Sequence, residues 1–152
     1  MVKINTQLFS DMDVNDVFFD DLKTFYPDFA DWFQRKSEQE AYAYTAYYEG
    51  TLVGFLYVKA EENENDDTIV PVLSYSNWLK IGTFKVSHCN QGIGSQFMNI
   101  VQEKAKEKHV QGVYVTLFTE TTEQQNLQRF LEKRGFFHHG YKNKEHVYIY
   151  FL

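Results

Sequence analysis

The 152-residue sequence contains one cysteine, two prolines and no long hydrophobic run. The single cysteine, Cys89, excludes an internal disulfide and a cysteine-rich metal site, which suits a reducing compartment. The longest apolar stretch, residues 52–58, is far shorter than the roughly 20 residues of a membrane span. Residues 1–10 contain one lysine and no apolar core, unlike a signal peptide. These absences predict a cytoplasmic protein that does not act on a membrane.

Basic residues are scarce in the first part of the sequence. Residues 1–67 carry 15 acidic and 5 basic side chains, a balance of −10, whereas residues 68–152 carry 6 and 10, a balance of +4. The second part therefore suits a phosphorylated ligand, and the first suits either a cationic ligand or ordinary solvated surface. The net charge of −6 argues against non-specific nucleic-acid binding, which requires neutralised phosphates.

The hydrophobic pattern predicts a single domain, residues 1–152, of mixed α/β class. Strands are expected at residues 2–9, 41–48, 52–59, 78–86, 113–118, 136–141 and 146–152. Two short helices are expected between residues 14 and 33, a third from about 95 to 109, and a fourth between a capping box at Thr121 and Gly135. Helices alternate with strands only late in the chain, which predicts antiparallel hairpins first and a parallel step across residues 87–94.

The segment from Phe84 to Ser95 is the most informative feature of the sequence. An alternating strand ends in a polar loop with two glycines, Gly92 and Gly94, and a helix follows. Glycines let backbone N–H groups converge, and a helix N-terminus favours anions, so this arrangement predicts a phosphate or pyrophosphate site. A Walker loop is excluded because Ser95 follows the last glycine instead of lysine. A dinucleotide fingerprint fits poorly, because Phe97 stands where a small residue is needed.

Three sequence motifs resemble those of the GNAT (GCN5-related N-acetyltransferase) superfamily. Residues 89–94 (CNQGIG) correspond to the family's Gln/Arg-x-x-Gly-x-Gly/Ala motif. Residues 49–55 (EGTLVGF) resemble the hairpin of its second and third strands, and residues 130–136 (FLEKRGF) resemble the end of its fourth helix. The resemblance implies about seven strands, mostly antiparallel with a parallel step from the fourth to the fifth, and four helices on both faces.

The resemblance also implies an acyl-CoA-dependent N-acyltransferase, with acetyl-CoA as co-substrate and no metal. An amine, on a small molecule or a protein, would attack the thioester directly. Backbone groups of Phe84 and Val86 would pair with the pantetheine arm. The pyrophosphate would be bound by N–H groups of the glycine loop: Gln91, Gly92, Ile93, Gly94 and Ser95.

The sequence departs from the family pattern at two positions. Cys89 stands at the motif's usual Gln/Arg, and Leu131 stands where many members have the tyrosine that reprotonates the leaving thiolate. Tyr148 or Tyr150 on the last strand could replace that acid, with Tyr148 preferred, and Glu120 could act as a base through a water. Packing for the tyrosines and solvation for Glu120 are the alternative interpretations. The missing tyrosine equally allows a catalytically weak domain that binds CoA or a protein partner.

The remaining candidate features carry less functional information. His138 and His139 are adjacent on an expected strand, so their side chains should point to opposite faces and not form a metal pair. Cys89 has no readable Cys-His-Asp/Asn partners and is interpreted as incidental. The apolar final strand, residues 147–152, could pair within the sheet or across a homodimer, and the sequence leaves both open.

Overall fold

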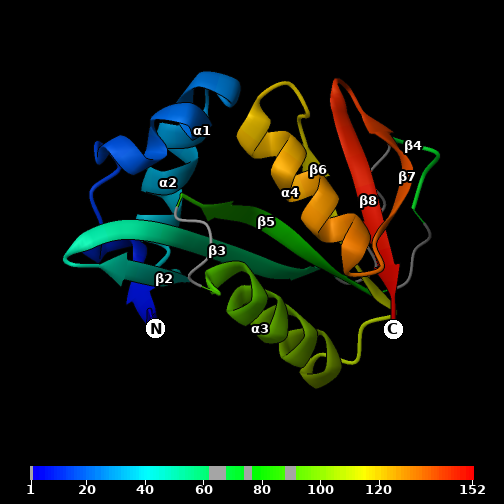
Figure 1. Ribbon diagram of the computed structural model, residues 1–152, viewed down its shortest axis with the longest axis horizontal. Coiled ribbons are helices and arrows are strands. Elements are labelled where there is room, and N and C mark those ends of the chain that lie inside the picture. Colours follow the sequence, from blue (N-terminus) through cyan, green and yellow to red (C-terminus); the bar gives the residue numbers. More distant parts are fainter. Residues whose placement is uncertain (1, 62–67, 74–76, 88–91) are drawn as a thin grey trace. The chain divides into compact units, whose positions relative to one another are not determined.

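A computed structural model describes residues 2–61, 68–73, 77–87 and 92–152 (Figure 1). Cys89 and Gln91 lie outside the described residues. The chain divides into two compact units, the first comprising Met1–Tyr57 and Thr83–Asn99 and the second Val58–Gly82 and Ile100–Leu152. Strands β3 and β5 contribute residues to both units. The expectation of a single domain over residues 1–152 remains a prediction.

The first unit contains an antiparallel hairpin that the sequence predicts. Strand β1 (Ile4–Leu8) pairs with β2 (Tyr42–Tyr48), which pairs with β3 (Thr51–Glu61). The turn between β2 and β3 consists of Glu49 and Gly50, whose φ angles are 50° and 81°. Two consecutive left-handed residues are the geometry of a type I′ turn, which matches the twist of the flanking strands.

Aromatic side chains form the core between this hairpin and the N-terminal helices. The helical segments are η1 (Phe9–Asp11), η2 (Val17–Phe19), α1 (Asp20–Phe25) and α2 (Phe29–Glu38). Helix η2 begins with a side-chain cap, because the Asp16 carboxylate accepts a hydrogen bond from the Phe18 N–H at 2.9 Å. Asp28 occupies the N-cap of α2, but its side chain makes no capping hydrogen bond. The core consists of Phe9, Phe18, Phe19, Phe29, Phe33, Ala43, Leu52 and Phe55.

Helix α3 (Ile93–Glu107) packs on the other face of this sheet. A Cβ added to Gly54 would lie 3.0 Å from Ile93 and 3.1 Å from Phe97, so glycine allows α3 to approach β3 closely. The next residue, Phe55, packs instead against Phe9 and Phe19. Alternation along one strand therefore places helices on both faces of the first unit's sheet, as predicted.

The second unit contains the parallel step. The first residues of β5 (Trp78–Val86) pair in parallel with β6 (Gly112–Leu117). Strand β6 pairs antiparallel with β8 (Glu145–Phe151), and β8 pairs antiparallel with β7 (Phe137–Lys142). Helix α4 (Thr122–Lys133) starts with the predicted capping box between Thr121 and Gln124 and is followed by Gly135 at a φ of 94°.

The fold is mixed α/β, with one mixed sheet and four α-helices. The described residues form eight strands where about seven were expected. The strand that sequence reasoning missed is β4 (Ile69–Val70), whose two residues are too few to show an alternating pattern. The sequence left open whether the final strand pairs within the sheet or across a homodimer. Strand β8 pairs with β6 on one side and with β7 on the other, so it pairs within the sheet.

Candidate functional site

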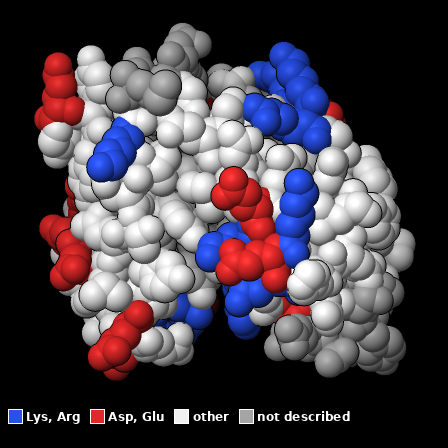
Figure 2. Space-filling view, turned by 90° about the horizontal axis from the view of Figure 1, so that it is seen from below, with Lys and Arg blue, Asp and Glu red and all other residues white. Residues whose placement is uncertain are grey.

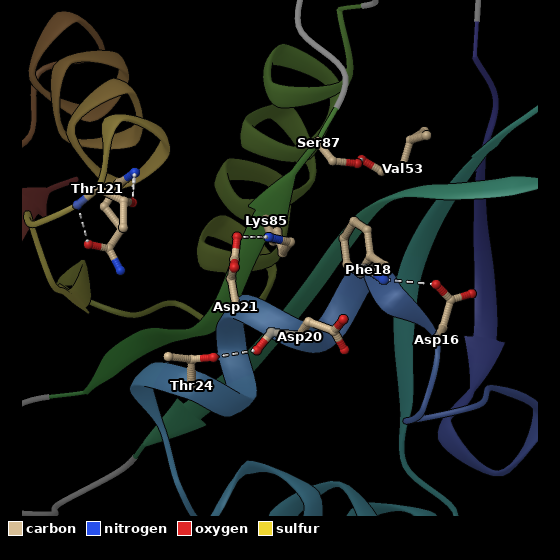
Figure 3. Close-up of polar contacts among 10 residues, drawn as sticks. Asp16, Phe18, Asp20, Asp21, Thr24, Val53, Lys85, Ser87 and Thr121 are labelled. Atoms are coloured by element: carbon tan, nitrogen blue, oxygen red, sulfur yellow. Dashed lines mark hydrogen bonds and ion pairs between the residues drawn. The ribbon is translucent and has the colours of Figure 1, made fainter.

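The predicted cofactor loop connects β5 to α3 in the first unit. Strand β5 ends at Val86, and the Ser87 N–H donates to the Val53 carbonyl at 2.9 Å, which anchors the start of the loop on β3. The Ser87 hydroxyl lies 3.4 Å from the same carbonyl oxygen (Figure 3). The Phe84 ring packs edge-on against Phe97 of α3, with centroids 5.7 Å apart. This aromatic contact joins the strand before the loop to the helix after it.

The last described part of the loop adopts the backbone that the motif requires. Gly92 has a φ of 71°, a left-handed conformation that strains side-chain-bearing residues, and among the described residues no atom lies within 4 Å of a Cβ built there. Glycine is therefore needed for its conformation and not for space. The Gln96 N–H donates the first helical bond, to the Gly92 carbonyl at 3.1 Å. Ile93, Gly94 and Ser95 thus form the first turn of α3, where the helix dipole is positive.

The face drawn in Figure 2 carries both acidic and basic side chains, and neither sign covers it continuously. The charge difference between the two parts of the sequence thus produces no single-sign field on this face. Individual ion pairs occur instead, including Lys85 with Asp21 at 3.8 Å in the first unit (Figure 3).

Tyr148, the preferred candidate acid, lies in the second unit with its phenol between two side chains of α4. Its O–H donates to Glu132 Oε2 at 2.9 Å, and Gln128 Nε2 donates to the phenol oxygen at 2.7 Å. The side chain is only 2% exposed. Burial is the main cause that raises the pKa of Tyr148, and the nearby Glu132 carboxylate raises this pKa further, against the opposing effect of the Gln128 hydrogen bond. The phenol is therefore protonated at neutral pH.

Sequence reasoning missed Gln128 and Glu132, although their spacing could have indicated them. Residues four apart on a helix lie on one face, so two polar side chains facing a tyrosine strand are a recognisable pattern. Leu131, at the family's usual tyrosine position, is fully buried in the core. On the same helix, Gln128 and Glu132 present polar side chains that hydrogen-bond the Tyr148 phenol of β8.

The other two candidates lie apart from this arrangement. Tyr150 is half-buried, and its ring packs on Phe136 with centroids 5.4 Å apart. Glu120 is exposed just before α4, and its backbone N–H donates to Gln124 Oε1 at 2.9 Å. Glu120 thus precedes the first turn of α4, whereas Tyr148 contacts the second half of the same helix.

The two adjacent histidines point to different partners, as the strand geometry predicts. His138 Nε2 lies 3.0 Å from His146 Nδ1 of β8, and His139 Nε2 lies 2.6 Å from the Pro71 carbonyl oxygen. Within the described part of the chain, no three His, Cys, Asp or Glu side chains are grouped as a metal site would require.

None of the described helices has the length and hydropathy of a membrane span.

We expect His138 to make the protein more sensitive to acid. Burial first, and then the neighbouring His146 and His139, lower the pKa of His138 below its ordinary 6.5, with Glu132 opposing. The unfolded chain therefore binds this proton at higher pH than the folded one, so stability is lost as pH falls below about 6.5. His138→Gln should show a shallower fall of Tm between about pH 7 and pH 5. The control is His109→Asn, which also removes one histidine, but at an exposed position with a left-handed backbone. A wild-type slope in His138→Gln would contradict the expectation.

The chain resembles known proteins in sequence and in fold. The family model described as the acetyltransferase (GNAT) family matches residues 7–136. No curated protein sequence matches the chain significantly. Among solved structures, PaiA N-acetyltransferase from Thermoplasma acidophilum in complex with coenzyme A is 11% identical, with a TM-score of 0.65 over 100% of this chain and 99% of that one.

Two further structures support the same fold. Arabidopsis thaliana NAA60 in complex with a bisubstrate analogue is 16% identical, with a TM-score of 0.62 over 98% of each chain. A putative acetyltransferase from Staphylococcus aureus is 18% identical, with a TM-score of 0.64 over 97% of each chain. The family model covers most of the sequence, including the strand, glycine loop and helix described above. The chain therefore belongs to the acetyltransferase (GNAT) family of enzymes.

Proposed function

We propose that the protein is an acyl-CoA-dependent N-acyltransferase that transfers acetyl from acetyl-CoA to a primary amine. The observation that carries the proposal is the β5–Gly92–α3 connection, with its left-handed glycine and helix start, inside the matched residues 7–136. Neighbours of this fold support the choice of ligand, because PaiA and Bacillus subtilis YlbP were solved with coenzyme A and NAA60 with acetyl-CoA.

The cofactor would be held mainly by backbone. Phe84 and Val86 would pair with the pantetheine arm as though it were an added strand, and N–H groups of Gly92, Ile93, Gly94 and Ser95, with Gln91, would bind the pyrophosphate. Backbone donors do not depend on side-chain identity. Cofactor binding should therefore tolerate the replacement of the motif's usual Gln/Arg by Cys89.

The reaction is a direct displacement at the thioester carbonyl. The neutral amine nitrogen attacks the carbonyl carbon, the C–S bond breaks, and the sulfur leaves as a thiolate. Positioning and polarisation of the carbonyl lower the barrier. One proton leaves the amine, to Glu120 through a water, and one returns to the thiolate, from the Tyr148 phenol.

Tyr148 is suited to the second proton transfer because its raised pKa keeps the phenol protonated at neutral pH. The hydrogen bond from Gln128 fixes the phenol oxygen, and Glu132 accepts a hydrogen bond from the phenolic O–H in the resting enzyme. A thiolate would compete with Glu132 for that proton. Tyr148 would regain it from solvent through the exposed Glu132 carboxylate.

The acceptor would be a primary amine on a small molecule or on a protein. NAA60 was solved with a bisubstrate analogue and the NatC complex with a Gag peptide and CoA, whereas another neighbour is an aminoglycoside acetyltransferase. These neighbours span peptide and small-molecule acceptors.

A second candidate function follows from the burial of Leu131. Because the family's usual tyrosine position is part of the core here, the domain could bind CoA or a protein partner with little turnover. The two functions differ in catalysis and not in cofactor affinity.

Thiol release from acetyl-CoA, measured against a panel of primary amines and peptide N-termini, tests the proposal. We expect amine-dependent release of CoA with one acetylated amine formed for each thiol. A protein that binds acetyl-CoA tightly but releases no thiol with any acceptor would favour the binding domain instead.

A further inference from the structure

Gln96 is a polar residue in the first turn of α3 that the proposed reaction does not use. Its backbone N–H donates the first helical hydrogen bond, to the Gly92 carbonyl at 3.1 Å. Its side chain reaches a different part of the first unit, because Nε2 donates to the Val2 carbonyl oxygen at 3.2 Å. Val2 precedes Gln96 by 94 residues and is only 5% exposed. One residue therefore joins the glycine loop and its helix to the residues before β1.

Contacts of two kinds hold the start of α3. Ile93 and Phe97 face Gly54 of β3, and Phe97 also packs edge-on against Phe84 of β5. These contacts are apolar, and apolar packing is non-directional, so it sets the distance of the helix from the sheet more than its rotation. The Gln96 hydrogen bond is directional. Because Gln96 lies about 100° around the helix from Phe97, its bond resists rotation of the first turn about the helix axis.

The rotation of this turn matters for the ligand assigned to it. The pantetheine arm is assigned to the backbone of β5, and the pyrophosphate to N–H groups that include those of Ile93 and Gly94. A ligand held by the strand at one end and by the helix at the other requires both in register. Rotation of the first turn would move these N–H groups sideways from the phosphate oxygens, and hydrogen bonds weaken steeply as their angle departs from linear.

We propose that Gln96 is a positioning residue that couples acetyl-CoA binding to the docking of residues 2–3 against α3. The coupling rests on the proposed function, because it concerns the affinity of the acetyl-CoA site. The docked Val2 carbonyl holds the Gln96 side chain, and thereby the first turn, in the orientation that binds pyrophosphate. By thermodynamic linkage, bound acetyl-CoA stabilises the docked residues by the same factor.

Gln96→Met tests this coupling, because it keeps the length of the side chain and removes the donor. The Kd for acetyl-CoA should rise about 5- to 10-fold in calorimetric titration. The KM for acetyl-CoA should rise with it, whereas kcat should change by less than about twofold, because Gln96 is assigned no contact with the acetyl group or the amine. A Kd that stays within about twofold of wild type would overturn the inference.

Gln102→Met is the matched control for this substitution. It removes a second glutamine from α3, beyond the first turn of the helix, and should bind acetyl-CoA as tightly as wild type. An equal loss of affinity in Gln102→Met and Gln96→Met would contradict a specific role for the contact with Val2.

A second variant acts on the other partner of the hydrogen bond. Val2→Asp places a carboxylate at a buried position, which favours undocking of residues 2–3. It should raise the Kd for acetyl-CoA by the same factor as Gln96→Met, and the double variant should bind no more weakly than either single one. Asn5→Asp adds the same charge at an exposed residue of β1 and should bind like wild type. Additive losses in the double variant would contradict the coupling.

Amide hydrogen exchange of wild type tests the coupling without any substitution, and so covers the case in which the variants do not fold. Saturating acetyl-CoA should slow exchange at residues 2–4 about 5- to 10-fold, and Gln96→Met should lose this local protection. Exchange at these residues that does not respond to acetyl-CoA would overturn the inference. If acetyl-CoA does not bind wild type, the proposed function fails and the coupling fails with it. If acetyl-CoA binds without slowing this exchange, only the inference about Gln96 fails.

Discussion

Tyr148→Phe is expected to lower kcat about 100-fold or more, with little change in the KM for acetyl-CoA. The substitution removes the phenolic proton donor while the buried ring stays. Because the cofactor is assigned to backbone groups of β5 and α3, its affinity should not depend on this hydroxyl. Steady-state thiol release with the best acceptor measures both constants.

Tyr150→Phe is the matched control for this prediction. Tyr150 lies two residues further along β8, and its ring packs on Phe136. Removing its hydroxyl should change kcat less than about threefold, on the scale of an indirect effect. Gln128 and Glu132 lose a hydrogen-bond partner in Tyr148→Phe, which could disturb the fold. The circular dichroism spectrum and the Tm of both variants must therefore stay near those of wild type. Full activity of a folded Tyr148→Phe would exclude Tyr148 as the acid.

Phe19→Ala is expected to destabilise the protein by about 3–5 kcal/mol. Phe19 is fully buried, and its ring contacts four other phenylalanines, Phe18, Phe29, Phe33 and Phe55, at centroid distances of 5.2–5.7 Å. Removing the ring leaves a cavity that surrounding rings cannot fill without breaking their edge-to-face packing. Tm should fall by about 10 °C or more, as measured by thermal or urea unfolding.

Val17→Ala tests whether this loss comes from the aromatic core. Val17 begins the same 3₁₀ helix but is 77% exposed, so its truncation should change stability by less than about 0.5 kcal/mol. A loss in Phe19→Ala no larger than in Val17→Ala would mean that the aromatic cluster does not hold η2 and α1 in place. These elements carry Phe18 and Asp21, whose ring centroid and carboxylate lie 5.3 Å and 3.8 Å from the Lys85 ammonium.

Most of the fold could be predicted because local signals agree with tertiary packing. The left-handed pair Glu49-Gly50, the Thr121–Gln124 capping box and the terminating Gly135 each determine a boundary through backbone chemistry alone. The Val14–Phe25 pattern was less informative. Its apolar spacing suits one helix, whereas the chain forms a 3₁₀ turn and then a six-residue helix so that Phe18 and Phe19 both reach the core.

The candidate site was only partly predictable, because it depends on contacts that have no local signature. The glycine loop carries its own backbone requirement, which Gly92 confirms with a φ of 71°. By contrast, the partners of Tyr148 come from α4, sixteen and twenty residues away in sequence. Lys85 likewise contacts Phe18 and Asp21, which precede it by more than sixty residues. Such long-range pairs follow from strand order and register, and the hydrophobic pattern does not specify them.

The most direct test of the acyltransferase account is thermal unfolding of the protein with acetyl-CoA, CoA, NADH and ATP. A ligand at about 100 times its Kd stabilises the native state by about 2.7 kcal/mol, which for this length is a rise in Tm of about 5–10 °C. The account predicts that rise with acetyl-CoA and with CoA alone. No rise with either, or a rise only with NADH or ATP, would contradict it.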